Sequence, residues 1–323
     1  MQADKPTSLV AALLLGCIGV FAIMAGPIIT EALVAALGIE PGVAGQIIAV
    51  EALGTALGPV AAAFWMPRVK WRTAAIVAIL VVITGNVISG SITSASSLAV
   101  LRFAVGFFGE GPAFALAIAI ISGTTQKDRN FAFLIAAQVV LGVLCFLLLP
   151  IPKDAGVSGV LLPLAGLALV TLFTVGWIPQ PDGAAGHHAG GGQAGGSALP
   201  AFIALAVMLI WCTGLGAIWF FIKLIGTSAG IDSTQVGVAL GVSTGVATLG
   251  ALAAAGLADR IGRIIPVTVA LLVQVVMIWL LQGEMSFLQF MLTAAIFQTF
   301  WNLNGPYIMG TIALSDTTGR VSL

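Results

Sequence analysis

Residues 250–263 of this chain read GALAAAGLADRIGR. The stretch begins as an apolar run of small residues and ends in Asp259, Arg260, Gly262 and Arg263. A second apolar run, IIPVTVALLVQVVMIWLLQ, follows directly. A short charged loop between two segments of membrane length is expected to lie at one face of a bilayer.

The composition agrees with a chain that lies mostly in lipid. Of its 323 residues, 59% are hydrophobic and 7% are charged, and the mean hydropathy is +1.14; a soluble domain has roughly 25% charged residues. Only helix bundles and closed barrels satisfy their backbone polar groups inside a bilayer. Barrel strands alternate polar and apolar residues over about ten positions, whereas the apolar runs here are long and unbroken. We therefore predict an all-α integral membrane protein.

Several functional classes are not expected. The formal net charge is zero and there is no basic tract, so a nucleic-acid partner is not predicted. Cys17, Cys145 and Cys212 stand alone in apolar runs, without the spacing of a metal or redox site. His187 and His188 are adjacent in a glycine-rich segment. We predict no metal, no cofactor and no enzymatic activity, and the chain has no Gly-Lys-Ser/Thr loop for ATP.

About 20 apolar residues form one crossing of a bilayer, and ten such segments are predicted. Pro27 and Pro306 are expected to break the first and the last of them, because proline interrupts helical hydrogen bonding. The predicted spans cover residues 9–37, 43–65, 72–92, 98–122, 131–151, 157–178, 200–225, 233–256, 264–282 and 286–313.

Positive charges are distributed unequally between the two sets of loops. One set of loops contains only a single lysine or arginine, Lys153. By the positive-inside rule the richer set is cytoplasmic, together with both termini. We expect a multi-pass protein of the cell membrane (inner or plasma membrane), with the lipid bilayer as a partner. The richer set contains Lys5, Arg68, Lys70, Arg72, Lys127, Arg129, Arg260, Arg263 and Arg320.

The spans fall into two groups. Residues 179–199 are rich in Gly and Ala and are predicted to be a flexible cytoplasmic linker. They separate an N-terminal bundle of six helices, residues 1–178, from a C-terminal bundle of four, residues 200–323. GPVAAAFWMPRVKWR at 58–72 aligns weakly with GALAAAGLADRIGRI at 250–264, and both join a second span to a third. This pattern favours two parallel repeats.

Residues 256–263, GLADRIGR, resemble the cytoplasmic signature of the major facilitator superfamily. The stretch RFAVG that begins at Arg102 resembles that family's second motif. The following GEGP, which contains Glu110, resembles the family's organic-anion branches, although the spacing from Arg to Glu is one residue longer here. The resemblance implies a two-bundle fold and transport by alternating access. It assigns a gating role to Gly256, Asp259, Arg260, Gly262 and Arg263.

Two features depart from that family. The loop of the first half has Pro67 at the position of Asp259, so its latch is expected to be lost or altered. The family has twelve spans, whereas this chain stops after ten, at residues 315–323. We therefore expect a truncated or partial chain whose C-terminal bundle is incomplete.

Five ionisable residues fall inside the predicted spans or near their ends: Glu31, Glu51, Arg102, Glu110 and Lys223. Because charges are costly in lipid, such residues usually mark a transport pathway. A carboxylate that moves between water and Arg102 can bind and release a proton, so we predict proton coupling at Glu31, Glu51, Arg102 and Glu110. In the alternative interpretation, Glu31 and Lys223 lie at the wet interface and Arg102 braces neighbouring helices.

The tenth predicted span combines amides and aromatic residues, which is typical of the wall of a polar substrate cavity. The alternative is that the amides hydrogen-bond across helices and only stabilise packing. The residues predicted to bind substrate are Gln298, Trp301, Asn302, Asn304, Tyr307 and Lys223.

The predicted function is secondary active transport of a small organic solute, coupled to protons and directed to efflux. The first alternative is an organic-anion uptake symporter, with Arg102 and Lys223 as counter-charges. The second is a membrane protein of the same family that does not transport.

Overall fold

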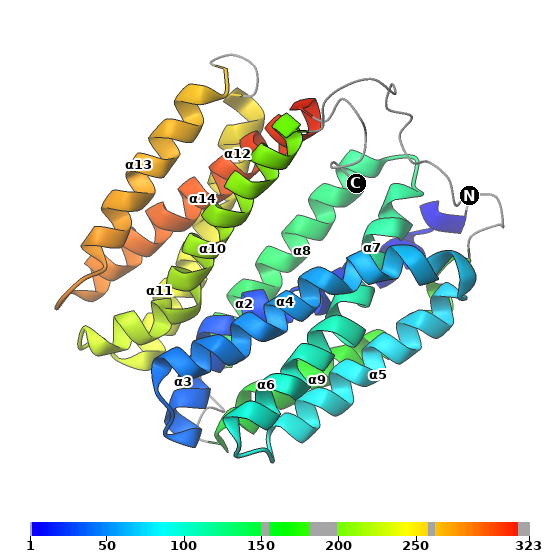
Figure 1. The fold of residues 1–323 in the computed structure, drawn as a ribbon, viewed down its shortest axis with the longest axis horizontal. Helices are drawn as coiled ribbons and strands as arrows, with labels where there is room; N and C mark the ends of the chain where they lie inside the picture. Colours follow the sequence, from blue (N-terminus) through cyan, green and yellow to red (C-terminus); the bar gives the residue numbers. More distant parts are fainter. Residues whose placement is uncertain (1, 150–154, 181–198, 258–261, 316–323) are drawn as a thin grey trace. The chain divides into compact units, whose positions relative to one another are not determined.

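The computed structural model describes residues 2–149, 155–180, 199–257 and 262–315 (Figure 1). These residues form helices joined by short connections and contain no β-strand, which confirms the all-α prediction. The chain divides into two compact units, residues 1–183 and 184–323. The histidines of the predicted linker, His187 and His188, lie outside the described residues.

The first unit contains the elements that follow the first six predicted spans. α6, η3 and α7 form one continuous helix, Ala95–Ser122. The elements are η1 (Gln2–Asp4), α1 (Pro6–Ile18), α2 (Phe21–Met24), α3 (Gly26–Leu37), α4 (Pro41–Trp65), η2 (Met66–Arg68), α5 (Trp71–Ser89), α6 (Ala95–Val105), η3 (Gly106–Glu110), α7 (Gly111–Ser122), α8 (Lys127–Leu148), α9 (Val157–Leu172) and η5 (Val175–Trp177).

The first predicted span is broken, as expected, into α1, α2 and α3. Pro27 lies in the first turn of α3, where the N–H that proline lacks would have no helical partner. A second interruption, which the sequence analysis did not predict, occurs at Gly19 and Val20. A Cβ atom on Gly19 would lie 2.5 Å from the Cβ of Phe114, so α1 approaches α7 closely there.

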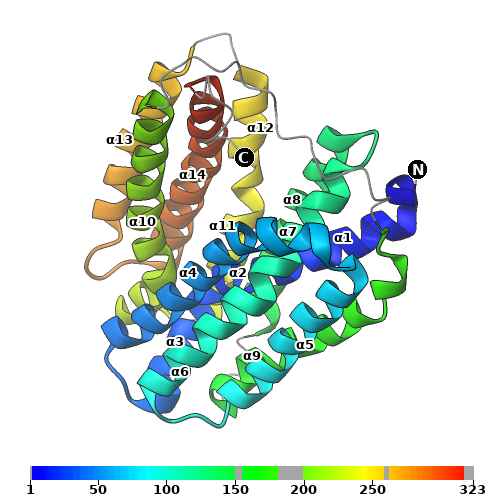
Figure 2. The same cartoon turned by 45° about the vertical axis from the view of Figure 1, so that its right-hand side comes forward.

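The continuous helix from α6 to α7 is the scaffold of the first unit. α4 packs against α6, η3 and α7, while α5 packs against α6, η3 and α9. Figure 1 and Figure 2 both show α4 and α5 beside this helix. Polar side chains of α4, α5 and α6 therefore meet inside the bundle.

In the second unit, α14 packs against each of the other four helices. The prediction of a break at Pro306 is wrong, because α14 continues through this proline without interruption. The lost N–H is one donor in a helix of 29 residues, and packing against its neighbours holds the remainder together. The elements are α10 (Leu199–Ser228), α11 (Ser233–Val246), α12 (Thr248–Leu257), α13 (Ile264–Leu280) and α14 (Phe287–Ser315).

The outer surfaces of both units are apolar. Val100, Phe173 and Trp279 are 72%, 79% and 68% exposed, respectively, as expected for side chains that face lipid. The count of ten spans stays a prediction. Six helices among the described residues are long and apolar enough to cross a bilayer: Pro41–Ala62, Trp71–Ser89, Ala95–Ser122, Arg129–Leu148, Ala206–Ser228 and Ser233–Ala254.

Candidate functional site

Arg102 and Glu51 form an ion pair inside the first unit. Arg102 lies on α6 and is 2% exposed, while Glu51 lies on α4 and is completely buried. The Nε of Arg102 donates to Oε2 of Glu51 over 2.9 Å, and its Nη2 donates to Oε1 of the same carboxylate. This two-point geometry fixes the carboxylate and the guanidinium in one plane and joins α4 to α6.

A third helix, α5, contributes two more partners to Arg102. The Nη1 of Arg102 donates to Oδ1 of Asn86 over 2.6 Å and to Oγ of Ser89 over 3.4 Å. Sequence reasoning missed both residues. The available signal was Asn86 itself, the only amide in the apolar run 72–92.

Glu110 ends η3 and is completely buried. Its Oε2 lies 2.8 Å from Oγ1 of Thr55 on α4, and its Oε1 has no hydrogen-bond partner among the residues that the structure describes. The hydroxyl of Thr55 also lies 3.1 Å from the carbonyl oxygen of Glu51. The ion pair and Glu110 therefore contact the same stretch of α4, residues 51–55.

The hydroxyl of Thr55 has a single proton, so it can donate to only one of these two oxygens. Both hydrogen bonds form together if Glu110 is protonated. The carboxyl O–H of Glu110 then donates to Oγ1 of Thr55, whose own O–H donates to the carbonyl of Glu51. The geometry of Thr55 thus fits a proton carried by Glu110.

A π-helical turn, η3, sets the position of Glu110 relative to Arg102. Consecutive residues of an α-helix are rotated by about 100°, so a spacing of eight would leave the two side chains roughly 80° apart. A π turn absorbs one extra residue and returns Glu110 to the face of Arg102 that meets α4. The unusual spacing noted in the sequence is thereby explained.

Glycines allow α4 to approach this turn closely. A Cβ on Gly106 would lie 2.3 Å from the carbonyl oxygen of Glu51 and 2.8 Å from the backbone nitrogen of Thr55. A Cβ on Gly54 would lie 2.5 Å from the carbonyl oxygen of Phe103. Backbone atoms cannot move aside as side-chain ends do, so any larger residue would separate the helices that hold the ion pair.

The second unit contains an aromatic cluster around Trp301 of α14. Its ring makes edge contacts with Trp211, Trp219 and Phe297, at centroid distances of 6.5, 6.2 and 6.0 Å, respectively. The Nε1 of Trp211 donates to Oε1 of Gln274 over 3.1 Å. The tenth span predicted from sequence therefore packs its tryptophan against α10, which the sequence alone did not indicate.

Buried amides lie on the same helix as Trp301. Thr244 of α11 donates to Oε1 of Gln298 over 3.1 Å, but Nε2 of Gln298 has no partner among the described residues. Asn304 is completely buried, and neither its Oδ1 nor its Nδ2 has a partner in the same part of the chain. Buried polar groups without partners are costly, so these atoms are candidates for contact with a solute.

The remaining predicted residues are distributed over both units. Lys223 is completely buried on α10, and Tyr307 is buried on α14. Asn302 is exposed, and its Nδ2 donates to the carbonyl of Gln298 in its own helix. Glu31 is half-buried on α3, which packs against α4.

The gating motif is described only in part. Asp259 and Arg260 lie outside the described residues. Gly256 belongs to the last turn of α12, and Arg263 directly precedes α13. Gly262 has φ of 66°, a left-handed conformation that favours glycine. The turn between the two helices thus requires the glycine that the motif contains.

Comparisons with known proteins bear on the family and the fold. The family model described as Major Facilitator Superfamily matches residues 11–321. No curated protein sequence matches the chain.

Solved structures of transporters resemble the fold. A D-xylose-proton symporter gives a TM-score of 0.71 at 11% identity, covering 98% of this chain and 87% of its own. The nucleoside transporter NupG gives 0.72 at 11% identity, with coverage of 98% and 88%. A bacterial homologue of the human lysosomal transporter Spinster gives 0.62 at 15% identity, with coverage of 98% and 77%. Identities this low show a common fold.

Proposed function

Because the chain belongs to the major facilitator superfamily, whose members include secondary transporters of small solutes, we propose that it transports a solute with proton coupling at Glu51, Arg102 and Glu110. The chain is an integral multi-pass membrane protein. The observation that carries the proposal is the pair of contacts at Thr55, whose hydroxyl lies against the carboxyl group of the buried Glu110 and against the backbone carbonyl of Glu51, the residue that pairs with Arg102.

The charges of this cluster require one proton. Arg102 supplies one positive charge, whereas Glu51 and Glu110 supply two carboxyl groups. Glu110 and the ion pair contact the same stretch of α4, residues 51–55. A buried net charge is costly, and one proton on Glu110 makes the cluster neutral. Loss of that proton creates a second carboxylate that competes with Glu51 for Arg102, which would loosen the joint between α4 and α6.

We propose an organic solute of mixed polarity. The rings around Trp301 offer apolar contact, and the buried amides of Gln298 and Asn304 offer hydrogen bonds. Lys223 and Tyr307 are proposed to contribute to the same wall. The alternative, an organic-anion uptake symporter, would use Arg102 and Lys223 as counter-charges, and the guanidinium of Arg102 already binds Glu51 at two points. We therefore keep efflux in exchange for protons as the proposed direction, and uptake of an organic anion, with Lys223 as its counter-charge, as the alternative.

The resemblance to the family motif supports a latch at residues 256–263. Asp259 and Arg263 are proposed to hold neighbouring helix ends in one state of the alternating cycle, and Arg260 and Gly256 to support them. The left-handed Gly262 shapes the turn.

The proposal is tested by proton movement in proteoliposomes that contain the purified chain and a pH-sensitive dye. The solutes would be a panel of aromatic organic cations, nucleosides and sugar acids. The wild type is compared with Glu110→Gln and Glu51→Gln. Glu40→Gln is the matched control, because Glu40 is exposed at the start of α4.

Proton movement that depends on one solute class, lost in Glu110→Gln and kept in Glu40→Gln, supports the proposal. Solute movement that continues with its proton movement unchanged in both cluster variants would refute coupling at this site. The direction of the proton movement distinguishes efflux by exchange from uptake with protons.

A further inference from the structure

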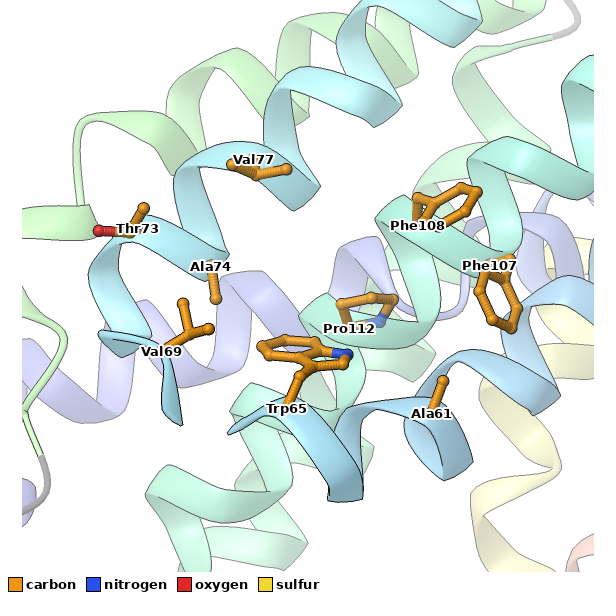
Figure 3. Close-up of a pocket in the computed structure, with 9 residues that line it drawn as sticks. All are labelled: Ala61, Trp65, Val69, Thr73, Ala74, Val77, Phe107, Phe108 and Pro112. Atoms are coloured by element: carbon orange, nitrogen blue, oxygen red, sulfur yellow. The ribbon is translucent and has the colours of Figure 1, made fainter. Parts of the chain in front are cut away.

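A groove of about 280 Å³ opens on the apolar surface of the first unit (Figure 3). Side chains of α4 and α5 form its two walls. Phe107 of η3 and Pro112 of α7, both on the continuous helix Ala95–Ser122, close it from a third side. Both α4 and α5 pack against η3. The groove is the space that remains between α4 and α5 at the surface. The groove does not include any residue of the proton-coupling cluster.

The lining is almost entirely hydrocarbon. In Figure 3 the ring of Trp65 lies opposite Ala74 and Val77, and the only hydroxyl among the labelled side chains belongs to Thr73. Val77 and Phe108 are 54% and 57% exposed. A polar solute would find few hydrogen-bonding partners in this groove. An alkyl chain needs no hydrogen bonds, so it can bind there through apolar contact alone.

One end of the groove reaches the turn between α4 and α5. Val69 of this turn lines the groove, while Val77 lies six residues after Trp71, or about 9 Å along α5. Trp65 and Trp71 flank the turn, a placement typical of the interface between lipid tails and headgroups. The groove is therefore expected to extend from the headgroup level into the hydrocarbon of the adjoining leaflet.

The turn is strongly basic. Arg68 and Lys70 flank Val69, and both are exposed. The Nη1 of Arg68 donates to the carbonyl of Phe64, and the Nε of Arg72 donates to the carbonyl of Ile178 over 2.9 Å. Residues 66–72 contain no Asp or Glu, so the two exposed cations have no acidic neighbour within the turn. Basic residues at a membrane surface attract anionic lipid headgroups.

From this juxtaposition of an apolar groove and two exposed cations, we propose that the groove binds one acyl chain of an anionic phospholipid. The phosphate of that lipid lies at Arg68 and Lys70, and its chain lies along Trp65 and Val77. The two cations favour an anionic headgroup, and the groove fixes where the acyl chain lies. The lipid would hold the α4–α5 turn in place beside the helix that contains Glu110.

The test is native mass spectrometry of the full chain in detergent, titrated with phosphatidylglycerol or with phosphatidylcholine of the same acyl chains. Val77→Trp fills the groove. Val87→Trp is its matched control, because Val87 lies on the same helix and is 51% exposed. Arg68→Gln with Lys70→Gln removes the headgroup contacts, and Lys5→Gln with Arg129→Gln removes two cations elsewhere.

One tightly retained phosphatidylglycerol is expected, with weaker binding of phosphatidylcholine. Val77→Trp abolishes this binding and Val87→Trp leaves it intact. Removing Arg68 and Lys70 weakens it by about fivefold for each cation, whereas the distant pair has no effect. Thr73→Leu, a smaller filling change, repeats the test if Val77→Trp does not fold.

Equal retention of the two lipids, or equal binding by Val77→Trp and Val87→Trp, would overturn the proposal. Loss of phosphatidylglycerol with the distant cations as much as with Arg68 and Lys70 would show nonspecific attraction to a basic surface. That result also overturns the site.

Discussion

Arg102 connects three helices through one guanidinium group. Its hydrogen bonds reach Glu51 on α4 and Asn86 and Ser89 on α5. Transfer of these charges out of water is costly, so their value depends on the presence of both partners. The residue can thus act in coupling and also brace the bundle, the two roles that the sequence left open.

We predict that Arg102→Gln destabilises the first unit by about 3–5 kcal/mol, because it leaves the carboxylate of Glu51 buried without its partner. Adding Glu51→Gln should recover most of this loss. Thermal unfolding in detergent of the wild type, both single variants and the double variant measures the coupling. A double variant less stable than Arg102→Gln alone would contradict the ion pair.

Variants of Thr55 test whether its hydroxyl proton takes part in proton movement. Thr55→Val keeps the shape of the side chain but removes the hydroxyl between Glu110 and the carbonyl of Glu51. Loss of a buried hydrogen-bond partner costs about 1–3 kcal/mol, so we expect solute-driven proton movement to fall on the order of tenfold. Thr55→Ser restores the hydroxyl and should retain the flux. Equal flux in the valine and serine variants would exclude this hydroxyl from the proton path.

Asp4 lies outside the spans and gives a prediction about pH. The backbone N–H and the hydroxyl of Thr125 both donate to Oδ1 of Asp4, at 2.7 and 2.9 Å. These bonds lower the pKa of Asp4 from its ordinary value of 3.8. A lowered pKa in the folded state means that the contact stabilises the fold above pH 3.8 and is lost as the pH falls through the lower, folded value.

Hydrogen exchange at the Thr125 amide measures this contact. Protection is expected near neutral pH and should disappear below the folded-state pKa of Asp4. Asp4→Asn should show little pH dependence in the same range. Unchanged protection of the wild type across that range would mean that the Asp4 carboxylate does not hold the loop.

At the scale of the helix, η3 decides which residues share a face. A spacing of eight residues between Arg102 and Glu110 brings both to α4 only because the π turn absorbs one position. The sequence showed the long spacing, but not how the chain accommodates it. Hydrophobic periodicity does not distinguish a π turn from a helix that simply rotates Glu110 away.

Deletion of Phe108 should convert this turn into ordinary α-helix and leave a spacing of seven residues, about 20° from two full turns. Arg102 and Glu110 then still share a face, so proton movement should persist. Insertion of one Ala after Phe108 should rotate Glu110 away and abolish it. Phe108 is 57% exposed, so its loss leaves no buried cavity, although it removes one of the side chains that line the surface groove. Retained coupling in the insertion variant would show that the register is unimportant.

The helices themselves followed from hydropathy, since long apolar runs in lipid have no alternative to helix. Pro27 begins α3 as expected, whereas Pro306 does not end α14. The difference is local: Pro27 occupies a first turn, where no N–H is needed, and Pro306 lies within a long helix held by four neighbours. The sequence composition alone does not show whether neighbouring helices will stabilise a helix that contains an internal proline.

The sequence predicted the family through a short motif, and the match over residues 11–321 shows the same family. The ionisable residues of the first unit were found individually, because charges stand out in apolar runs. Their partners Asn86, Ser89 and Thr55 were not, because ordinary polar residues become significant only when three helices bring them together. The identity of the solute depends on features that short motifs do not contain.

We propose that Glu110 carries a proton beside the neutral Glu51–Arg102 pair. Infrared spectroscopy of the purified chain in lipid tests it directly, because a protonated carboxyl group has a C=O stretching band distinct from the carboxylate bands. We predict such a band at neutral pH, absent from Glu110→Gln and present in Glu40→Gln. A band that persists in Glu110→Gln, or a wild type with carboxylate bands alone, would exclude a proton on Glu110.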